Sequence, residues 1–255
     1  MWPYPRTVAH RGGGTLAPEN TIAALRCGLA HGYRAVEFDV MLASDGVPVV
    51  VHDVELGRTM AGSGAIPDYT AVQLAAMDAG SWFGAEFAGE GVPSFEAVVA
   101  YCQAHGIWMN IEIKPAPGFE VRTGEVVARL ARQHFAAGGL LPLLSSFSIE
   151  ALQAAREAAP ELARGLLVDA LPPEWLAQAR ALDVVAMHCD HMPLTREQVQ
   201  AIKAEGYGVF CYTVNTQARA SELLEWGVDG FCTDRIDAIE FIDDAAEIRG
   251  QTRRV

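Results

Sequence analysis

Short apolar runs alternate with longer amphipathic segments along most of the chain. Eight of the runs have the length and composition of buried strands, at residues 7–9, 35–42, 107–113, 142–145, 166–168, 184–187, 209–214 and 230–232. Apolar residues recur at helical spacing in segments between these runs, at residues 21–30, 95–104, 125–135, 149–158, 198–204 and 218–226. Repeated strand–helix units predict a parallel sheet, and eight such units in 255 residues predict a closed (β/α)8 TIM barrel.

One additional apolar run, at residues 47–51, breaks the alternation. It follows the run at 35–42 after only four residues, which include the turn-forming pair Asp45-Gly46. This connection is too short for a crossover helix, so the two strands should form an antiparallel hairpin that brings His52 opposite Glu37 or Phe38. Residues 53–93 fit no strand–helix unit, and we expect them to form an insertion over the mouth of a single domain that spans residues 1–255.

Four polar clusters lie where buried strands should end. They are His10-Arg11, Glu37-Phe38-Asp39, His52-Asp53 and Glu112-Ile113-Lys114. In a barrel of this type the C-terminal ends of the strands meet on one face, where active sites form. Side chains two residues apart on a strand share a face, so each acidic strand should present its charged groups together.

Glu37, Asp39 and Glu112 are the candidate metal ligands. Because their neighbours Val36, Phe38 and Val40 on the opposite face of that strand are apolar, the carboxylates should point into the barrel, where unpaired charge is costly. Three oxygen ligands suit one divalent cation, Mg²⁺ or Ca²⁺, better than zinc. The alternative is a buried ion pair with Arg11 or Lys114.

Two histidines and two cationic side chains complete the candidate chemistry. His10 and His52 can transfer protons, whereas Arg11 and Lys114 can bind an anionic phosphate. His188 follows the predicted strand at 184–187 at the same end of the barrel, where both substrate contact and a structural role are open. His191 lies there as well, with the same two alternatives.

Composition limits the partners of the protein. A formal charge of −13 argues against nucleic acid and against stable association with membrane surfaces, so the site itself must be locally positive to attract a phosphate ester. Five scattered cysteines suggest reduced core residues. The N-terminus has no apolar signal core, and no run is long enough to span a bilayer, so we expect a cytoplasmic protein, either monomer or homodimer.

These clusters resemble the motifs of the glycerophosphodiester phosphodiesterase family. The likeness includes residues 18–21, Pro-Glu-Asn-Thr, in which Asn20 or Thr21 reads best as a helix N-cap, and continues through residues 144–147, 212–215, 226–230 and 233–234. The opening residues 2–6 and the segment 187–191 look closest to the short cytosolic enzyme of bacterial glycerol-phosphate uptake systems. The resemblance therefore covers nearly the whole chain.

The resemblance implies a barrel with a small inserted subdomain and a divalent cation. The implied reaction is hydrolysis of glycerophosphodiesters, such as glycerophosphocholine and glycerophosphoethanolamine, to sn-glycerol 3-phosphate and an alcohol. By position, Glu37, Asp39 and Glu112 match the metal ligands, His10 and His52 the acid/base pair, and Arg11 and Lys114 the phosphate contacts. Tyr212 stands where many members carry tryptophan, and we expect it to contact substrate with His188.

Two alternative functions stay open at this point. A lysophospholipase D-type phosphodiesterase would need an apolar groove at the barrel mouth, which Trp82, Phe83 and Phe87 could line. A non-catalytic protein that binds glycerophosphodiesters would need neither both histidines nor all three carboxylates.

Overall fold

The computed structural model describes residues 2–136 and 141–239. The strands in this part of the chain are β1 (Thr7–Ala9), β2 (Ala35–Leu42), β3 (Pro48–Val50), β4 (Trp108–Ile113), β5 (Leu143–Ser146), β6 (Ala163–Val168), β7 (Ala186–Asp190), β8 (Gly208–Tyr212) and β9 (Gly230–Thr233). The α-helices are α1 (Ile22–Ala30), α2 (Ala71–Ala75), α3 (Phe95–Ala104), α4 (Glu120–Phe135), α5 (Ile149–Ala158), α6 (Trp175–Leu182), α7 (Arg196–Ala204) and α8 (Gln217–Trp226).

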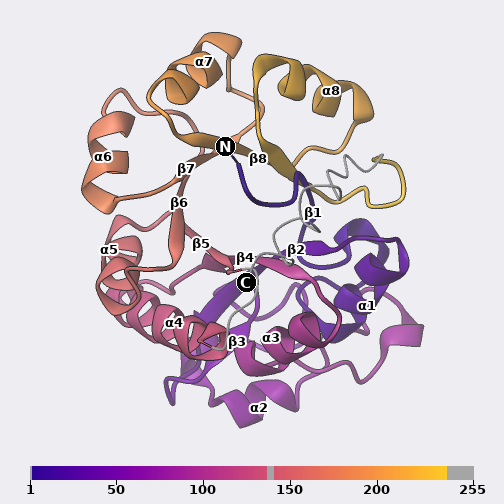
Figure 1. Ribbon diagram of the computed structural model, residues 1–255. Coiled ribbons are helices and arrows are strands. Elements are labelled where there is room, and N and C mark those ends of the chain that lie inside the picture. The colour runs from indigo at the N-terminus through magenta and orange to yellow at the C-terminus, as the bar shows by residue number, and fades with distance from the viewer. Residues whose placement is uncertain (1, 137–140, 240–255) are drawn as a thin grey trace.

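Parallel pairing closes these strands into a barrel. The hydrogen-bonded order runs from β1 through β9, β8, β7, β6, β5 and β4 to β2, and β1 also pairs with β2. Figure 1 shows the helices as a ring around the strands. The predicted (β/α)8 TIM barrel is confirmed, and α6 is a helix beyond those that the apolar pattern indicates.

The predicted hairpin is present as the antiparallel pair β2–β3. Its register places Val40 opposite Val50, and the backbone N–H of Val51 donates to the carbonyl of Asp39 at 3.0 Å. Gly46 supports the turn with a φ of +78°, a conformation that favours glycine. His52 follows one residue after Val51 and lies close enough to Asp39 for the two charges to interact, so the hairpin carries it to the strand of the acidic pair.

The alternation of side chains along β2 sorts apolar from acidic groups. Val36, Phe38 and Val40 are buried in the core between the strands and helices α3 and α4. Each fully buried side chain of this size contributes on the order of 2 kcal/mol of hydrophobic stabilisation. Because neighbours on a strand face opposite sides, Glu37 and Asp39 are directed into the barrel.

Aromatic side chains from the N-terminal segment pack at the base of the barrel. Tyr4 stacks on Trp108 with ring centroids 5.0 Å apart, and Trp2 stacks on Phe210 at 6.1 Å. They join a buried cluster with Val8 of β1. The base is therefore filled with apolar groups, whereas the polar groups gather toward the other end.

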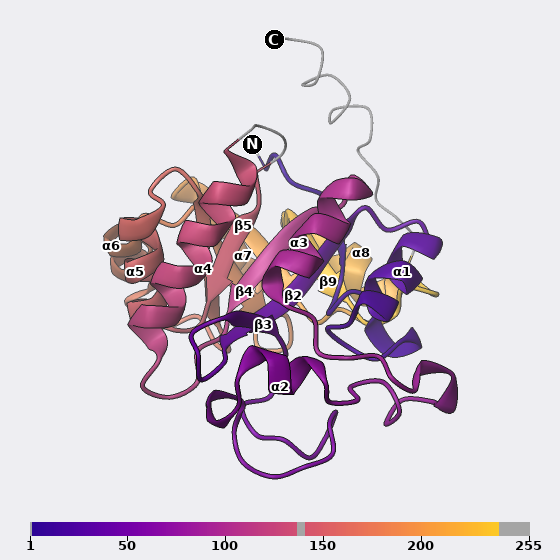
Figure 2. The same ribbon diagram turned by 90° about the horizontal axis from the view of Figure 1, so that it is seen from below.

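Residues 53–93 contain α2 and the 3-10 turns η2 (Ile66–Asp68) and η3 (Ala85–Phe87). Met60, Ile66 and Leu74 form a small core that packs against Met41 and Val49 of the hairpin. Figure 2 shows this segment as a lobe beside β3 and α3. Its contacts fix the hairpin that leads to His52, whereas its role as a cover over the barrel mouth stays a prediction.

The bounds of one predicted strand are wrong in a way that affects the site. The apolar pair Val184-Val185 reads as strand, yet pairing with β6 begins only at Ala186, and Val185 is 44% exposed. Asp183, in a left-handed conformation with φ of +52°, ends α6 and turns the chain just before this point. His188 consequently lies within β7 and not after it.

The cysteines and helices agree with the other expectations from composition. All five cysteines are free thiols, and all but Cys27 are buried. Burial raises the pKa of the Cys102 thiol to about 12, as expected of a reduced core residue. None of the helices in the described ranges has the length and apolar character needed to cross a bilayer.

Candidate active site

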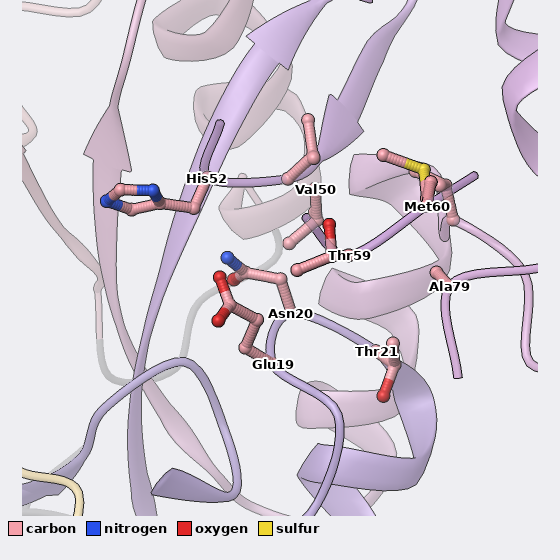
Figure 3. Close-up of a pocket in the computed structure, with 10 residues that line it drawn as sticks. Glu19, Asn20, Thr21, Val50, His52, Thr59, Met60 and Ala79 are labelled. Carbon is pink, nitrogen blue, oxygen red and sulfur yellow. The ribbon is translucent and has the colours of Figure 1, made fainter. Parts of the chain in front are cut away.

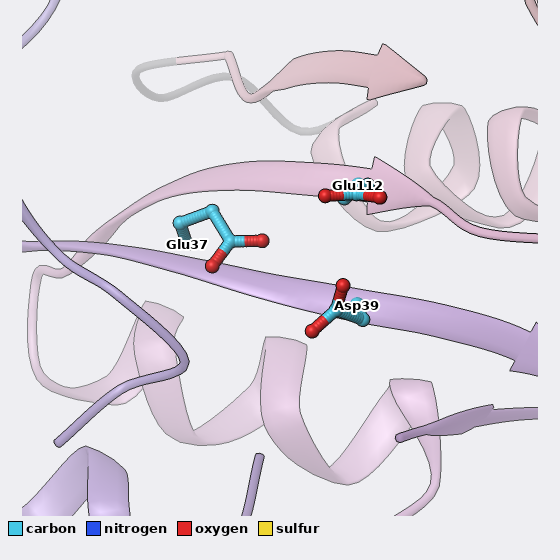
Figure 4. Close-up of side chains that lie close together, drawn as sticks. All are labelled: Glu37, Asp39 and Glu112. Atoms are coloured by element: carbon cyan, nitrogen blue, oxygen red, sulfur yellow. The ribbon is translucent and has the colours of Figure 1, made fainter. Parts of the chain in front are cut away.

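Three acidic side chains from two adjacent strands meet inside the barrel. The β2–β4 register places Asp39 directly beside Glu112, and Glu37 lies on the same face of β2. One carboxylate oxygen from each residue lies within 4.8 Å of the others. Figure 4 shows the three carboxylates turned toward one another. Their exposed fractions are only 4%, 1% and 8% for Glu37, Asp39 and Glu112.

The electrostatics of this triad fit a bound cation. Burial and mutual repulsion raise the pKa of Glu37 and raise that of Glu112 to about 8. The Oε1 atoms of both residues are buried and have no hydrogen-bond partner within the described ranges. Burial alone would raise the pKa of Asp39. The positive charges of Lys114 and Arg11 have the larger combined effect, so the pKa of that carboxyl is lowered. A divalent cation would offset this repulsion and coordinate the remaining oxygens.

Arg11 and Lys114 border the carboxylates from two strand ends. The Arg11 backbone N–H donates to Glu37 Oε2 at 3.1 Å, and its Nε lies 3.7 Å from Asp39 Oδ2. Lys114 Nζ lies 3.3 Å from Asp39 Oδ1 and 3.7 Å from Glu112 Oε1. Both cationic side chains are partly exposed, at 19% and 25%, so a phosphate could reach them.

The two candidate histidines are each held through Nδ1 by an aspartate. His10 follows β1, and its Nδ1 lies 2.6 Å from Asp234 Oδ1, while its Nε2 lies 3.8 Å from Glu37 Oε2. His52 Nδ1 lies 2.7 Å from Asp53 Oδ1. When an aspartate occupies Nδ1, the opposite ring nitrogen is left to exchange a proton with another group.

Burial lowers the pKa of His52, and the positive charges of Arg11 and Lys114 lower it further against the opposing effect of Asp39. This lowered pKa favours the neutral form of the imidazole. A neutral imidazole whose Nδ1 donates to a carboxylate can accept a proton at Nε2.

His188 and Tyr212 share a cavity with the acidic triad and His10. It is lined by His10, Glu37, Asn110, Glu112, Phe147, Leu167, His188, Phe210, Tyr212 and Cys232. His188 packs on Phe210 at 4.9 Å, and burial lowers its pKa to about 3, so its ring is neutral. Neither ring nitrogen has a hydrogen-bond partner in the described chain. The Tyr212 hydroxyl donates to the carbonyl of Val168 at 3.0 Å.

His191 is not among the residues that line this cavity. Its Nδ1 accepts a hydrogen bond from Arg219 Nε at 3.2 Å, and its backbone carbonyl accepts another from the same guanidinium. This favours the structural alternative for His191 and leaves substrate contact to His188.

Comparison with known proteins finds one family and several relatives that match most of the chain. The model of the glycerophosphoryl diester phosphodiesterase family matches residues 10–238. A structure of an Oleispira antarctica phosphodiesterase in complex with the product sn-glycerol-3-phosphate superimposes with a TM-score of 0.85 at 37% identity, covering 90% of this chain and 93% of that one. The Bacillus subtilis protein YhdW is 33% identical over 240 residues, covering 91% of this chain and 95% of that protein. The glycerophosphodiester phosphodiesterase of Caldanaerobacter subterraneus is 32% identical over 231 residues, covering 89% and 93%.

The chain belongs to the glycerophosphoryl diester phosphodiesterase family. It is an enzyme of that class, and the expected resemblance is confirmed at the level of the family. The closer likeness to the cytosolic enzyme of glycerol-phosphate uptake systems stays a prediction. Membership of a family of hydrolases argues against the non-catalytic binding protein.

Asn20 contacts a candidate metal ligand of this phosphodiesterase, which is a role beyond the structural one predicted for it. Thr21 is the true N-cap of α1, because its side chain accepts from the backbone N–H of Ala24. The Asn20 side chain instead forms two hydrogen bonds with Asp39, donating from Nδ2 to Oδ2 at 2.8 Å and accepting the backbone N–H at 3.2 Å. Asn20 is only 5% exposed. Its two hydrogen bonds therefore hold a candidate metal ligand in a defined orientation away from solvent.

Glu19 and Arg58 were also missed. Glu19 accepts from Arg11 Nη1 at 2.7 Å and from two nitrogens of Arg58 at the same distance. Arg58 in turn binds Asp53, the partner of His52. Figure 3 shows Glu19 and His52 around one small cavity. These ion pairs connect the inserted segment to both a candidate phosphate ligand and a candidate acid/base group.

Replacing Asn20 with alanine should weaken divalent-cation binding by about 10- to 100-fold, because the Asp39 carboxylate loses the donor that orients it and the Asp39 backbone N–H loses its acceptor. Titration of the purified protein with Mn²⁺, followed by electron paramagnetic resonance, measures the change. Thr21→Ala is the matched control, since it removes the helix cap, worth about 1 kcal/mol of stability, without touching the triad. Equal cation affinity in wild type and Asn20→Ala would remove Asn20 from the site.

Proposed function

We propose that this enzyme hydrolyses glycerophosphodiesters, such as glycerophosphocholine and glycerophosphoethanolamine, to sn-glycerol 3-phosphate and an alcohol with one bound Mg²⁺ or Ca²⁺. The observation that carries the proposal is the meeting of three buried carboxylates, two cationic side chains and two aspartate-held histidines at one end of the barrel. The product named for the Oleispira antarctica structure supports the same reaction.

The charged groups divide into two roles. Glu37, Asp39 and Glu112 would hold the cation, which when bound neutralises charge on the phosphate. Arg11 and Lys114 would bind the phosphate oxygens directly, because both side chains are partly exposed and adjoin the triad. This local positive charge would attract the monoanionic phosphodiester despite the net charge of −13.

His10 and His52 would move the protons of the reaction. As one bond from an oxygen nucleophile to phosphorus forms and the bond to the departing alcohol oxygen breaks, one imidazole takes the proton of the nucleophile and the other protonates the alcohol. Each such transfer typically contributes about 10²- to 10⁴-fold to the rate. The nucleophile is water or the neighbouring glycerol hydroxyl, and in the second case water opens a cyclic phosphate.

His188 and Tyr212 would contact the bound substrate. Both line the cavity that begins at Glu37 and Glu112, and the neutral ring of His188 has a donor and an acceptor nitrogen without protein partners in the described ranges. A cavity that combines such groups suits a hydroxylated fragment. We therefore place a polar part of the diester there and expect the head group to be tolerated loosely.

The net charge of the chain bears on where the enzyme works and what it binds. We propose a cytoplasmic protein without stable membrane association, close to the cytosolic enzyme of bacterial glycerol-phosphate uptake systems. A surface of net charge −13 disfavours anionic lipid surfaces and nucleic acid. The binding partner is then a small diester. The enzyme would act as a monomer or as a homodimer.

A lysophospholipid is the second candidate substrate, and one observation favours it. Trp82 is 42% exposed, packs edge-to-face on Phe83, and lies 6.0 Å from the guanidinium of Arg58, which binds Asp53 beside His52. An exposed aromatic group at this place could contact an acyl chain. Phe83 also contacts Phe87 at 5.5 Å, so the three rings form one aromatic row.

Release of sn-glycerol 3-phosphate from glycerophosphocholine tests the proposal. Protein stripped with a chelator should release none, and adding back Mg²⁺, Ca²⁺ or Mn²⁺ singly should restore release with at least one of them. Lysophosphatidylcholine is the comparison substrate. Faster release of choline from it would favour the lysophospholipase D-type reaction, and no turnover of either substrate by a folded, metal-loaded protein would contradict both.

A further inference from the structure

The first and last strands of the barrel bring two polar residues together at its closing seam. β1 and β9 pair in parallel with Ala9 opposite Thr233, and the backbone N–H of His10 donates to the carbonyl of Thr233 at 3.0 Å. The residues that follow these strands, His10 and Asp234, consequently lie side by side. His10 Nδ1 is 2.6 Å from Asp234 Oδ1, which is a short hydrogen bond.

Asp234 is itself fixed by the next strand. Asn215, just beyond β8, donates from Nδ2 to Asp234 Oδ2 at 3.0 Å and accepts the backbone N–H of Asp234 at 2.8 Å. Both carboxylate oxygens of Asp234 therefore have defined partners. Because the second partner is a neutral amide, the carboxylate keeps its full negative charge toward His10.

The backbone of Asp234 is held from the opposite side by the loop after His10. Its carbonyl accepts the N–H of Thr15 at 2.9 Å and the hydroxyl of the same residue at 3.1 Å. Gly14 passes so close that a Cβ there would lie 2.1 Å from this carbonyl oxygen, and its φ is +53°. The position of the aspartate is thus set by contacts that do not involve the imidazole.

We propose that Asp234 is a positioning residue for His10, an inference that rests on the acid/base role proposed above for that histidine. As the acceptor at Nδ1, the carboxylate keeps the proton on Nδ1 and the ring turned so that Nε2 faces the site, 3.8 Å from Glu37 Oε2. The proton exchanged with substrate then moves only at Nε2. Asn215 supports this arrangement by holding Asp234.

Asp234→Asn tests the proposal because the new amide has the same shape but can present an N–H to the ring. An N–H facing Nδ1 forces the proton to Nε2, which is the wrong tautomer for accepting a proton from substrate. We expect kcat with glycerophosphocholine to fall by between about 10²- and 10⁴-fold, with KM changed less than about threefold. The ¹⁵N shifts of the His10 ring should move from the Nδ1–H pattern toward the Nε2–H pattern.

Asp237→Asn is the matched control. It removes the same charge three residues away, where the carboxylate forms an ion pair with the exposed Arg235, and it should leave kcat and the His10 shifts unchanged. Asn215→Ala is a second variant that keeps the aspartate but removes its amide partner, and it should give a smaller loss of kcat than Asp234→Asn.

The outcomes separate this proposal from the one on which it rests. If Asp234→Asn keeps the kcat and the His10 ring shifts of wild type while His10→Ala is inactive, Asp234 does not position His10 and the acid/base role stands. If His10→Ala itself keeps a near-normal rate, the acid/base role fails and Asp234 has no catalytic group to position. If Asp234→Asn does not fold, unchanged kcat and ring shifts in Asn215→Ala would contradict the proposal.

Discussion

Replacing Asp39 with asparagine should weaken divalent-cation binding by about 100-fold or more and remove most of the turnover that depends on the cation. Asp39 is the member of the triad whose pKa is lowered, so it brings a full negative charge to the site before a cation binds. The amide has the same shape and can keep the hydrogen bonds to Asn20, so the loss reports the charge and the oxygen ligand.

Isothermal titration with Mg²⁺ and Ca²⁺ measures this affinity without reference to catalysis. Asp45→Asn is a matched control, because Asp45 lies at the turn of the same hairpin and its carboxylate accepts from the backbone N–H groups of Val47 and Ala71. It should bind cations as wild type does. An Asp39→Asn protein that binds Mg²⁺ and Ca²⁺ normally would show that the triad is not the cation site and would favour the ion-pair alternative, in which Asp39 only balances Arg11 and Lys114.

The barrel and the acidic triad could be predicted because each depends on a local rule. Strand–helix alternation indicates the fold, and the two-residue period of a strand places Glu37 and Asp39 on one face. The short connection through Gly46 identifies the hairpin. Such rules need only a few consecutive residues, so one sequence suffices.

The contacts that surround the triad could not be predicted in the same way. Asp234 meets His10 across 224 positions of sequence, and Glu19 meets Arg58 across 39. No local pattern links such residues, because barrel closure and the packing of the inserted segment bring them together. Thr233-Asp234 at the end of the last predicted strand was the one available signal, since the parallel strands of the barrel all end at the same face.

The contact of Asn20 with Asp39 could not be predicted, because the sequence around Asn20 also fits the start of a helix. Pro-Glu-Asn-Thr before an apolar helix fits an N-cap, and Thr21 fulfils that role. Asn20 precedes the cap in a left-handed conformation with φ of +60°, which turns its amide toward Asp39. Asparagine tolerates this conformation better than most residues, so the residue type was itself a weak indication.

The substitutions His10→Ala and His52→Ala should each reduce kcat with glycerophosphocholine by at least about 10²- to 10⁴-fold while leaving the protein folded. Each imidazole lies at the rim of the triad, with Nδ1 held by an aspartate and a side chain that is 17% or 26% exposed. Removing such a partly exposed ring costs little packing, so circular dichroism and the melting temperature should change only slightly.

His105→Ala is the matched control, because that imidazole lies on the exposed end of α3, where it stacks on Tyr101 at 4.1 Å. The double variant of His10 and His52 should lose little more activity than the worse of the two single variants, since the two groups serve one proton-transfer sequence. A near-normal rate in either single variant would remove that histidine from the mechanism. Additive losses in the double variant would instead indicate that the two imidazoles act in separate steps, as hydrolysis through a cyclic phosphate permits.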